Sequence, residues 1–144
     1  MASYRAAVRR FVLDASALVE FLENRRGVAK VRRPMEEAFR HDGPLLMSAV
    51  NWGEVFYIGW KLHGESKARD AEAKLGQLPI AIIAADQERA SRAGAVKQKH
   101  GLAYADAFAA ELAIDRGAWL VTADPEFAKV GMALSILSLP RHQK

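Results

Sequence analysis

Short apolar runs alternate with longer amphipathic stretches along the chain. The apolar runs are rich in branched and aliphatic side chains and are typical of buried strands; they are residues 8–14, 45–47, 79–83, 119–122 and 134–139. The amphipathic stretches have apolar positions three and four residues apart and predict helices; they are residues 15–23, 28–41, 49–63, 65–76, 84–100, 104–116 and 124–127. Alternating strands and helices predict an α/β fold, with a parallel sheet covered by helices on both faces.

Capping and turn residues mark several ends of these predicted elements. Helix stop signals are Asn24, Gly27, Gly101 and Gly117. Ser48 stands where the N-cap of helix 49–63 is expected, and Pro125 occupies the favoured first position of a short helix. Pro34 is expected to kink or divide the helix at 28–41, because proline removes a backbone donor from a helix interior.

Length and composition limit the class of protein. The chain has 144 residues, of which 51% are hydrophobic and 26% charged. These values predict one globular domain over residues 1–144, with flexible tails at about 1–7 and 141–144. No apolar run approaches the roughly 18 residues of a membrane span, and the arginine-containing start does not resemble a signal peptide. Absence of cysteine excludes disulfides, thiolate metal sites and a cysteine nucleophile, and fits a cytoplasmic protein.

Positive charge is concentrated at the start of the chain. Residues 1–33 hold eight Lys and Arg side chains against three acidic ones, whereas residues 34–144 hold 13 against 14. A basic segment on a nearly neutral body suggests an anionic partner such as nucleic acid, although a solvated helix face explains it equally well. The candidates for contacts with a nucleic-acid backbone are Arg25, Arg26, Lys30, Arg32 and Arg33.

Four carboxylates stand where predicted strands end and the next helices begin. Asp14 and Asp124 follow strands, whereas Glu54 and Asp106 lie in the early turns of helices. Ligands of parallel α/β sheets bind outside the carboxyl ends of the strands, so we expect all four acids near one edge. Because such a group is unfavourable without a cation, it predicts a site for Mg²⁺ or Mn²⁺, which prefer oxygen ligands.

Each acid taken alone also has an ordinary structural interpretation. Asp14 and Asp124 could be helix N-caps, and Glu54 could be a solvated helix residue. Asp106 could complement a helix dipole. However, Asp106 lies among aromatic and alanine residues, where an unpaired charge is costly to bury. It therefore requires a partner, which could be a cation, a basic residue or water.

Three polar side chains are placed to support the acids. Asn51 precedes Glu54 by three residues, so the two share a helix face. Ser16 and Thr122 each lie two residues from an aspartate. All three could orient carboxylates or metal-bound water. Local capping is the alternative, and it is stronger for Ser16 than for Asn51.

Aromatic residues recur at a spacing of four in the helix at 49–63. They are Trp52, Phe56 and Trp60. Because this spacing is helical, we interpret them as core packing. The alternative is that apolar residues of the helices between about 16 and 62 form a groove for a peptide partner.

Four sequence blocks carry these acids in order along most of the chain: Val-Leu-Asp-Ala-Ser-Ala-Leu at 12–18, Asn-Trp-Gly-Glu-Val-Phe at 51–56, Tyr-Ala-Asp-Ala-Phe-Ala-Ala-Glu-Leu-Ala at 104–113 and Leu-Val-Thr-Ala-Asp-Pro-Glu-Phe at 120–127. Together they resemble the signature blocks of PIN-domain ribonucleases, and most closely those of the VapC toxins of bacterial and archaeal toxin–antitoxin pairs. No block is decisive alone, but four in the right order are specific. The longer arginine-rich start departs mildly from the shortest family members.

The resemblance implies a PIN-like three-layer sandwich with a central parallel sheet of four to five strands. It also implies a Mg²⁺- or Mn²⁺-dependent endoribonuclease that hydrolyses RNA phosphodiester bonds with one or two ions. By position, the acids that bind metal and carry catalysis would be Asp14, Glu54, Asp106 and Asp124. Ser16 and Thr122 match supporting polar positions, and Asn51 has a secondary role. The implied partners are RNA, a small VapB-like antitoxin and a second copy of the chain, without a membrane.

Three other functions remain open from the sequence. The chain could be a non-catalytic module that binds nucleic acid or protein, or a housekeeping nuclease that processes RNA. It could also be a phosphohydrolase acting on small substrates, although the chain lacks a glycine-rich phosphate loop with a following lysine.

Overall fold

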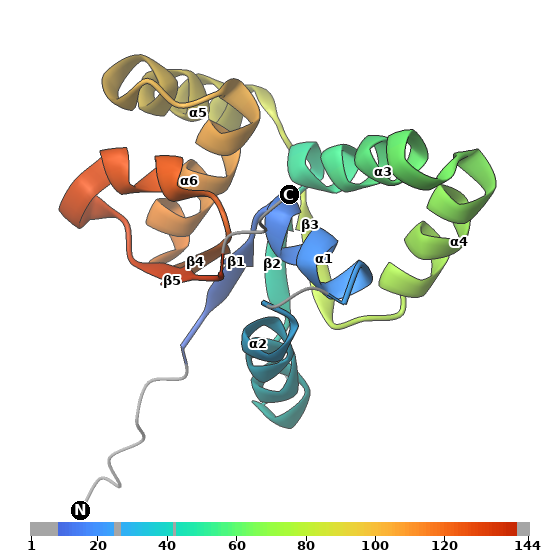
Figure 1. Ribbon diagram of the computed structural model, residues 1–144. Helices are drawn as coiled ribbons and strands as arrows, with labels where there is room; N and C mark the ends of the chain where they lie inside the picture. Colours follow the sequence, from blue (N-terminus) through green and yellow to red (C-terminus); the bar gives the residue numbers. More distant parts are fainter. Residues whose placement is uncertain (1–8, 25–26, 42, 141–144) are drawn as a thin grey trace, which may run out of the picture.

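The computed structural model describes residues 9–24, 27–41 and 43–140 (Figure 1). The strands are β1 (Phe11–Leu13), β2 (Leu45–Ser48), β3 (Ile80–Ile83), β4 (Trp119–Thr122) and β5 (Ile136–Ser138). They form one sheet in the order β3-β2-β1-β4-β5, and every neighbouring pair is parallel. The predicted parallel sheet is therefore confirmed, with β1 at its centre. The expected tails at 1–7 and 141–144 lie outside the described residues.

Helices cover both faces of this sheet. They are α1 (Ala15–Leu22), α2 (Val28–His41), α3 (Ala49–His63), α4 (Glu65–Leu75), α5 (Gln87–His100), α6 (Tyr104–Arg116) and the 3-10 helix η1 (Pro125–Ala133). Figure 1 shows α5 and α6 on one side of the sheet, with α1, α2, α3 and α4 on the other. Within the described residues, no helix combines the length and apolar character needed to cross a bilayer.

The alternation of side chains along the strands builds two separate cores. Val12 and Leu120 pack into the cluster beneath α5, α6 and η1. Leu13, Met47 and Val121 pack into the other cluster, beneath α1, α2, α3 and α4. Successive strand residues point to opposite faces, so apolar strands of three or four residues can bury both sides of the sheet. The three-layer arrangement predicted from the sequence is confirmed.

Local signals place several element ends where the sequence predicts them. The hydroxyl of Ser48 accepts a hydrogen bond from the Val50 N–H at 3.2 Å and so caps α3. Gly101 and Gly117 end α5 and α6 with φ of 71° and 59°, a left-handed conformation that favours glycine. Pro125 is the first residue of η1.

One predicted helix start is wrong, and so is the expectation that Pro34 could divide its helix. The helix expected from residue 84 begins at Gln87, because the Asp86 carboxylate accepts a hydrogen bond from the Arg89 N–H at 2.8 Å and caps the helix there. Pro34 lies inside α2 and does not divide it. Proline removes one backbone hydrogen bond from this helix, but Val31 and Met35 bury the same helix against the sheet and offset that loss.

A buried ion-pair network joins α5 to α6. The Arg89 guanidinium donates through Nη1 to both carboxylate oxygens of Glu111, at 3.1 and 2.8 Å, and both side chains are buried. Arg92 donates to the same carboxylate at 2.7 Å, and Arg89 also reaches Asp115 at 3.3 Å. This network fixes the helix whose first turn carries Asp106.

Candidate active site

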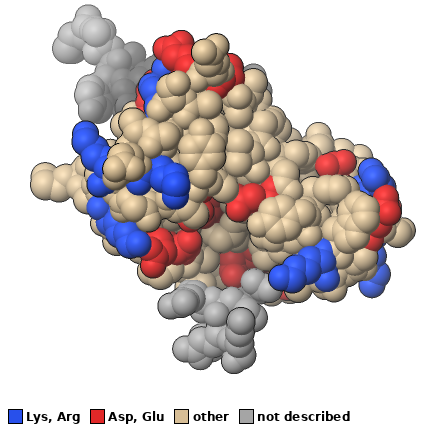
Figure 2. Space-filling model, turned by 90° about the horizontal axis from the view of Figure 1, so that it is seen from above, with Lys and Arg blue, Asp and Glu red and all other residues tan. Residues whose placement is uncertain are grey.

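A cleft of about 500 Å³ opens at the carboxyl edge of β1 and β4. It is lined by all four predicted acids: Asp14, Glu54, Asp106 and Asp124. They come from the end of β1, from α3, from α6 and from the segment after β4. Figure 2 looks onto this edge and shows acidic side chains in a hollow, with many Lys and Arg side chains toward the rim. The fold therefore gathers carboxylates that are far apart in the sequence.

Asp14 is the most enclosed of the four acids, with 3% of its surface exposed. Its Oδ1 accepts hydrogen bonds from the Ser16 hydroxyl at 2.6 Å and from the Ala17 N–H at 3.1 Å. Its Oδ2 accepts a hydrogen bond from the Thr122 hydroxyl at 2.6 Å. Asp14 therefore caps α1 and also lines the cleft. The N-cap interpretation of this residue does not exclude a role in the site.

Burial governs the protonation of Asp14. Desolvation raises its pKa to about 7, against the lowering effect of the three hydrogen bonds, and the charge of Asp106 raises the pKa further. A carboxyl with this pKa carries its negative charge only at a cost near neutral pH. Positive charge delivered to the cleft would remove that cost.

Asp106 stands in the first turn of α6 without any hydrogen bond or ion pair to the described residues. Its pKa is raised to about 6, first by partial burial and then by the negative charges of Asp124, Glu54 and Glu126. This mutual repulsion shows that the carboxylates of the cleft are close enough to influence one another. The sequence predicts a partner for the Asp106 charge. Among the described residues, no basic side chain fills that role.

Glu54 and Asp124 each use one oxygen within the protein. The Oε1 of Glu54 accepts a hydrogen bond from Asn51 Nδ2 at 2.8 Å. The Oδ1 of Asp124 accepts one from the Glu126 N–H at 2.9 Å, which caps η1. The second oxygen of each has no partner among the residues that the structure describes. Each acid therefore keeps one carboxylate oxygen that could coordinate a metal ion.

Ser16 and Thr122 connect the two strand ends that carry aspartates. Their hydroxyls lie 3.2 Å apart, and each donates to the Asp14 carboxylate. The Ala123 N–H donates to Ser16 at 2.9 Å, and the Asp124 N–H donates to Thr122 at 2.9 Å. Ser16 is not the cap of α1, which is Asp14; its hydroxyl instead joins α1 to the segment after β4.

Asn51 connects α3 to α6 from a fully buried position. Its Nδ2 donates to Glu54 at 2.8 Å and to the carbonyl oxygen of Ala105 at 3.1 Å, next to Asp106. Its Oδ1 is buried and has no hydrogen-bond partner within the described part of the chain. The side chain therefore relates two acids that lie on different helices.

Two acidic residues near the cleft were not among the sequence candidates. Glu20 is buried, lines the cleft and accepts a hydrogen bond from the Gly27 N–H at 3.2 Å. It follows Ser16 by four residues, a helical spacing that could have pointed to it. Glu126 raises the pKa of Asp106 and forms an ion pair with Lys129. It follows Asp124 by two residues, at the start of the same short helix.

The predicted contacts to a nucleic-acid backbone are not gathered at the cleft. Lys30, Arg32 and Arg33 are exposed on α2 and do not line it. Lys30 donates to the carbonyl oxygen of Ser138 at 3.2 Å. Arg25 and Arg26 lie outside the described residues. Contact between these side chains and RNA stays a prediction.

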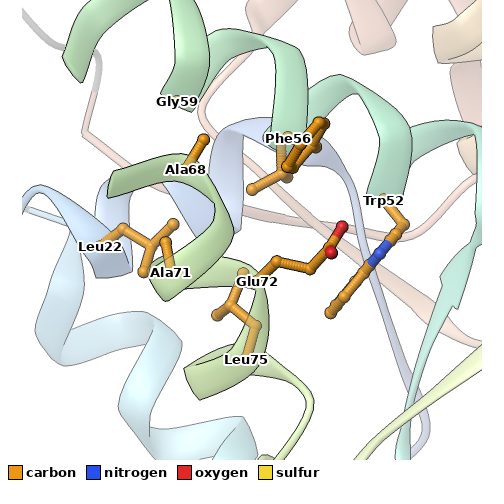
Figure 3. A pocket seen from close by; sticks show the side chains of 9 residues that line it. Leu22, Trp52, Phe56, Gly59, Ala68, Ala71, Glu72 and Leu75 are labelled. Carbon is orange, nitrogen blue, oxygen red and sulfur yellow. The ribbon is translucent and has the colours of Figure 1, made fainter. Parts of the chain in front are cut away.

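A second, apolar pocket lies between α1, α3 and α4 (Figure 3). Its lining consists of Leu22, Trp52, Val55, Phe56, Gly59, Ala68, Ala71, Glu72 and Leu75. Trp52 packs partly against the core, as expected. The core prediction is wrong for Trp60, which is 44% exposed and packs edge-on against Phe56 with ring centroids 5.9 Å apart.

The donor set of the cleft fits a hard divalent cation. All four acids offer oxygen, and none forms an ion pair with a Lys, Arg or His of the described residues. Among the described residues, however, no three His, Asp or Glu side chains are close enough together to hold one ion as they stand. The chemistry and charge therefore suit a metal, and its ligands remain a prediction.

Comparisons with known proteins agree with this architecture. The family model described as PIN domain matches residues 11–132. No curated protein matches the chain by sequence. Similar solved structures include a DNA-bound VapBC from Salmonella typhimurium, with TM-score 0.71, 17% identity and coverage of 90% of this chain and 98% of that one. At this identity the likeness shows the fold.

Two further solved structures have the same fold. The sarcin-ricin loop cleaving toxin VapC20 from Mycobacterium tuberculosis matches with TM-score 0.66 and 15% identity, covering 84% of this chain and 95% of that one. A toxin–antitoxin complex from Klebsiella pneumoniae matches with TM-score 0.63 and 23% identity, covering 91% and 98%.

Proposed function

This chain belongs to the PIN-domain family, and we propose that it is a Mg²⁺- or Mn²⁺-dependent endoribonuclease, the toxin of a type II toxin–antitoxin pair. One observation carries the proposal. Four carboxylates from separate segments line one cleft, and within the described residues no basic side chain neutralises them. Such an arrangement is costly to fold and therefore points to a cationic ligand.

The residues that would hold the ion are Asp14, Glu54, Asp106 and Asp124. When bound, a divalent ion supplies positive charge to a scissile phosphate and lowers the pKa of water. The raised pKa of Asp14 and of Asp106 supports this assignment, because both carboxyls become easier to ionise beside a cation.

The chain's own hydrogen bonds would hold these carboxylates in place. Ser16 and Thr122 donate to opposite oxygens of Asp14 and restrict its rotation. Asn51 donates to one oxygen of Glu54, and no residue that the structure describes bonds to the other. Such outer contacts typically change metal affinity or activity by about 10- to 100-fold when they are removed. We propose these three residues as positioning residues.

RNA is the proposed substrate, and an antitoxin protein is the proposed inhibitor. A sarcin-ricin loop cleaving toxin and several toxin–antitoxin complexes share this fold, which supports both assignments. The apolar pocket between α1, α3 and α4 is the surface that we assign to the antitoxin, since apolar segments bind in grooves between helices (Figure 3). We further propose a homodimer that acts in the cytoplasm as a single domain.

Incubation of the purified protein with single-stranded RNA tests the nuclease. We expect cleavage in Mn²⁺ or Mg²⁺, none in EDTA, and none from Asp14→Ala. Asp70→Ala serves as the matched control, because Asp70 is an exposed acid on α4 outside the cleft. Cleavage by Asp14→Ala at the wild-type rate would refute the site.

Other functions give different results in the same assay. A non-catalytic binding module would retain RNA without cutting it, and a phosphohydrolase would prefer a generic phosphate ester to RNA. The toxin role is separated from housekeeping RNA processing by the neighbouring reading frames. A small adjacent gene for a DNA-binding protein, whose co-expression relieves growth arrest, is the result expected for a toxin.

A further inference from the structure

The acidic cleft also has an aliphatic wall, formed by Val19, Ile58 and Leu62. Residues four apart share one face of a helix, so Ile58 and Leu62 continue the row that begins with Glu54 on α3. Val19 reaches the same cleft from α1. Leu62 is 50% exposed, and Val19 and Ile58 are half-buried. The cleft thus places open apolar surface beside its carboxylates.

Charge restricts what can lie against this wall. The cleft is lined by the four acids and by Glu20, so a further phosphate would meet strong repulsion there. The phosphate next to the cleaved one must then stay toward the rim. The part of a nucleotide that can enter is its uncharged base, and burying the flat apolar face of a base on aliphatic side chains is favourable.

We propose that the aliphatic wall binds one unpaired nucleobase of the RNA, adjacent to the phosphodiester that is cut. This inference rests on the proposed nuclease function. Val19, Ile58 and Leu62 have no side-chain donor or acceptor, so the wall senses the presence of a base without reading its edge. A base in a duplex is stacked and paired and cannot reach the wall.

Abasic substitution tests the wall. Short single-stranded RNAs with one abasic site on either side of the cut bond are compared with the intact RNA in Mn²⁺. For wild-type protein we expect one of the two abasic RNAs to lose about tenfold in kcat/KM. Leu62→Ala should lose about fivefold on intact RNA and less than about twofold on that abasic RNA, because the contact is already missing.

Ile114→Ala is the matched control, since Ile114 is an aliphatic residue of α6, 40% exposed and outside the cleft. It should leave both substrates unchanged, and thermal melts check that each variant is folded. Equal losses on intact and abasic RNA would overturn the base site while leaving the nuclease intact. Unchanged cleavage by Leu62→Ala would also overturn the base site and would favour a protein partner at the wall. Absence of any metal-dependent cleavage overturns the nuclease and the base site together.

Discussion

At the scale of single residues, Asp14 and Asp106 share a cleft but not a structural role. Three hydrogen-bond donors hold Asp14, whereas no described residue bonds to Asp106. Replacing Asp14 therefore disturbs the fold as well as the site. Asp106 gives the cleaner test, because its carboxylate contributes repulsion rather than structure.

Asp106→Asn should separate activity from stability. Removing the charge should reduce metal-dependent cleavage more than about a hundredfold. In chelator, the variant should unfold at higher temperature, with a gain of about 1 kcal/mol once solvent screening is allowed for. Calorimetry of the metal-free proteins checks the second effect, and a clear loss of stability would show that Asp106 is structural.

The same variant predicts a pH dependence. The Asp106 carboxyl has a pKa of about 6 in the folded protein, against an ordinary value of 3.8, so folding favours its protonated form. In chelator, this contribution to stability is present below pH 3.8 and is lost as the pH rises to about 6.

The stability advantage of Asp106→Asn over wild type should therefore grow between these pH values and level off above them. Urea denaturation at a series of pH values measures it. An advantage that shrinks with rising pH would contradict the pKa shift, and saturating Mn²⁺ should reduce or reverse the advantage at pH 7.

At the scale of elements, α3 and α6 each carry one acid, and Asn51 relates the two helices. Asn51→Ala should lower the free energy of unfolding by about 2 kcal/mol, because the two hydrogen bonds that Asn51 donates, to Glu54 and to the Ala105 carbonyl, are lost. It should also slow cleavage about tenfold, because Glu54 is released. Denaturation and kinetics are compared with Gln98→Ala, an exposed amide on α5. Loss of stability without loss of rate would limit Asn51 to a structural role.

The packing of α5 against α6 depends on the buried pair between Arg89 and Glu111. Glu111→Ala should cost about 3 kcal/mol of unfolding free energy, because it leaves the Arg89 guanidinium buried without its main partner. The double variant Arg89→Met, Glu111→Leu should recover most of that loss, since apolar side chains of similar size fill the space. Urea titrations of the wild type and the two variants measure these free energies of unfolding. Equal losses for the single and the double variant would refute the idea that an unpaired buried guanidinium causes the loss.

At the scale of the whole molecule, periodicity predicts the fold because the strands alternate between two cores and most helices end at recognisable caps. Sequence reasoning is weaker where a contact is distant. The pair of Arg89 with Glu111 spans two helices, and local spacing does not choose its partners. Trp60 has the same helical spacing as core residues, yet it remains on the surface beside Phe56.

The site follows a similar division. The sequence predicts that the four acids lie near one edge, because strand ends and the helices that follow them meet there in a parallel sheet, and all four do line one cleft. Their role as metal ligands stays a prediction. The hydrogen bond from Thr122 to Asp14 could not, since it depends on which strands are neighbours. β1 pairs with β2, the next strand in the sequence, and also with β4. The pairing with β4 brings Thr122 into contact with Asp14.

The pairing of β1 with β4 also determines when, during synthesis, the proposed active site can form. The central strand is made first, but its neighbour β4 follows more than a hundred residues later, and Asp124 later still. Ribosome-bound chains arrested before β4 emerges should cut no RNA, while chains extended by a flexible linker should cut it. If the proposed toxin function holds, the nascent chain stays inactive until residue 124 has emerged, and an antitoxin that is already present can bind the chain as soon as the cleft forms.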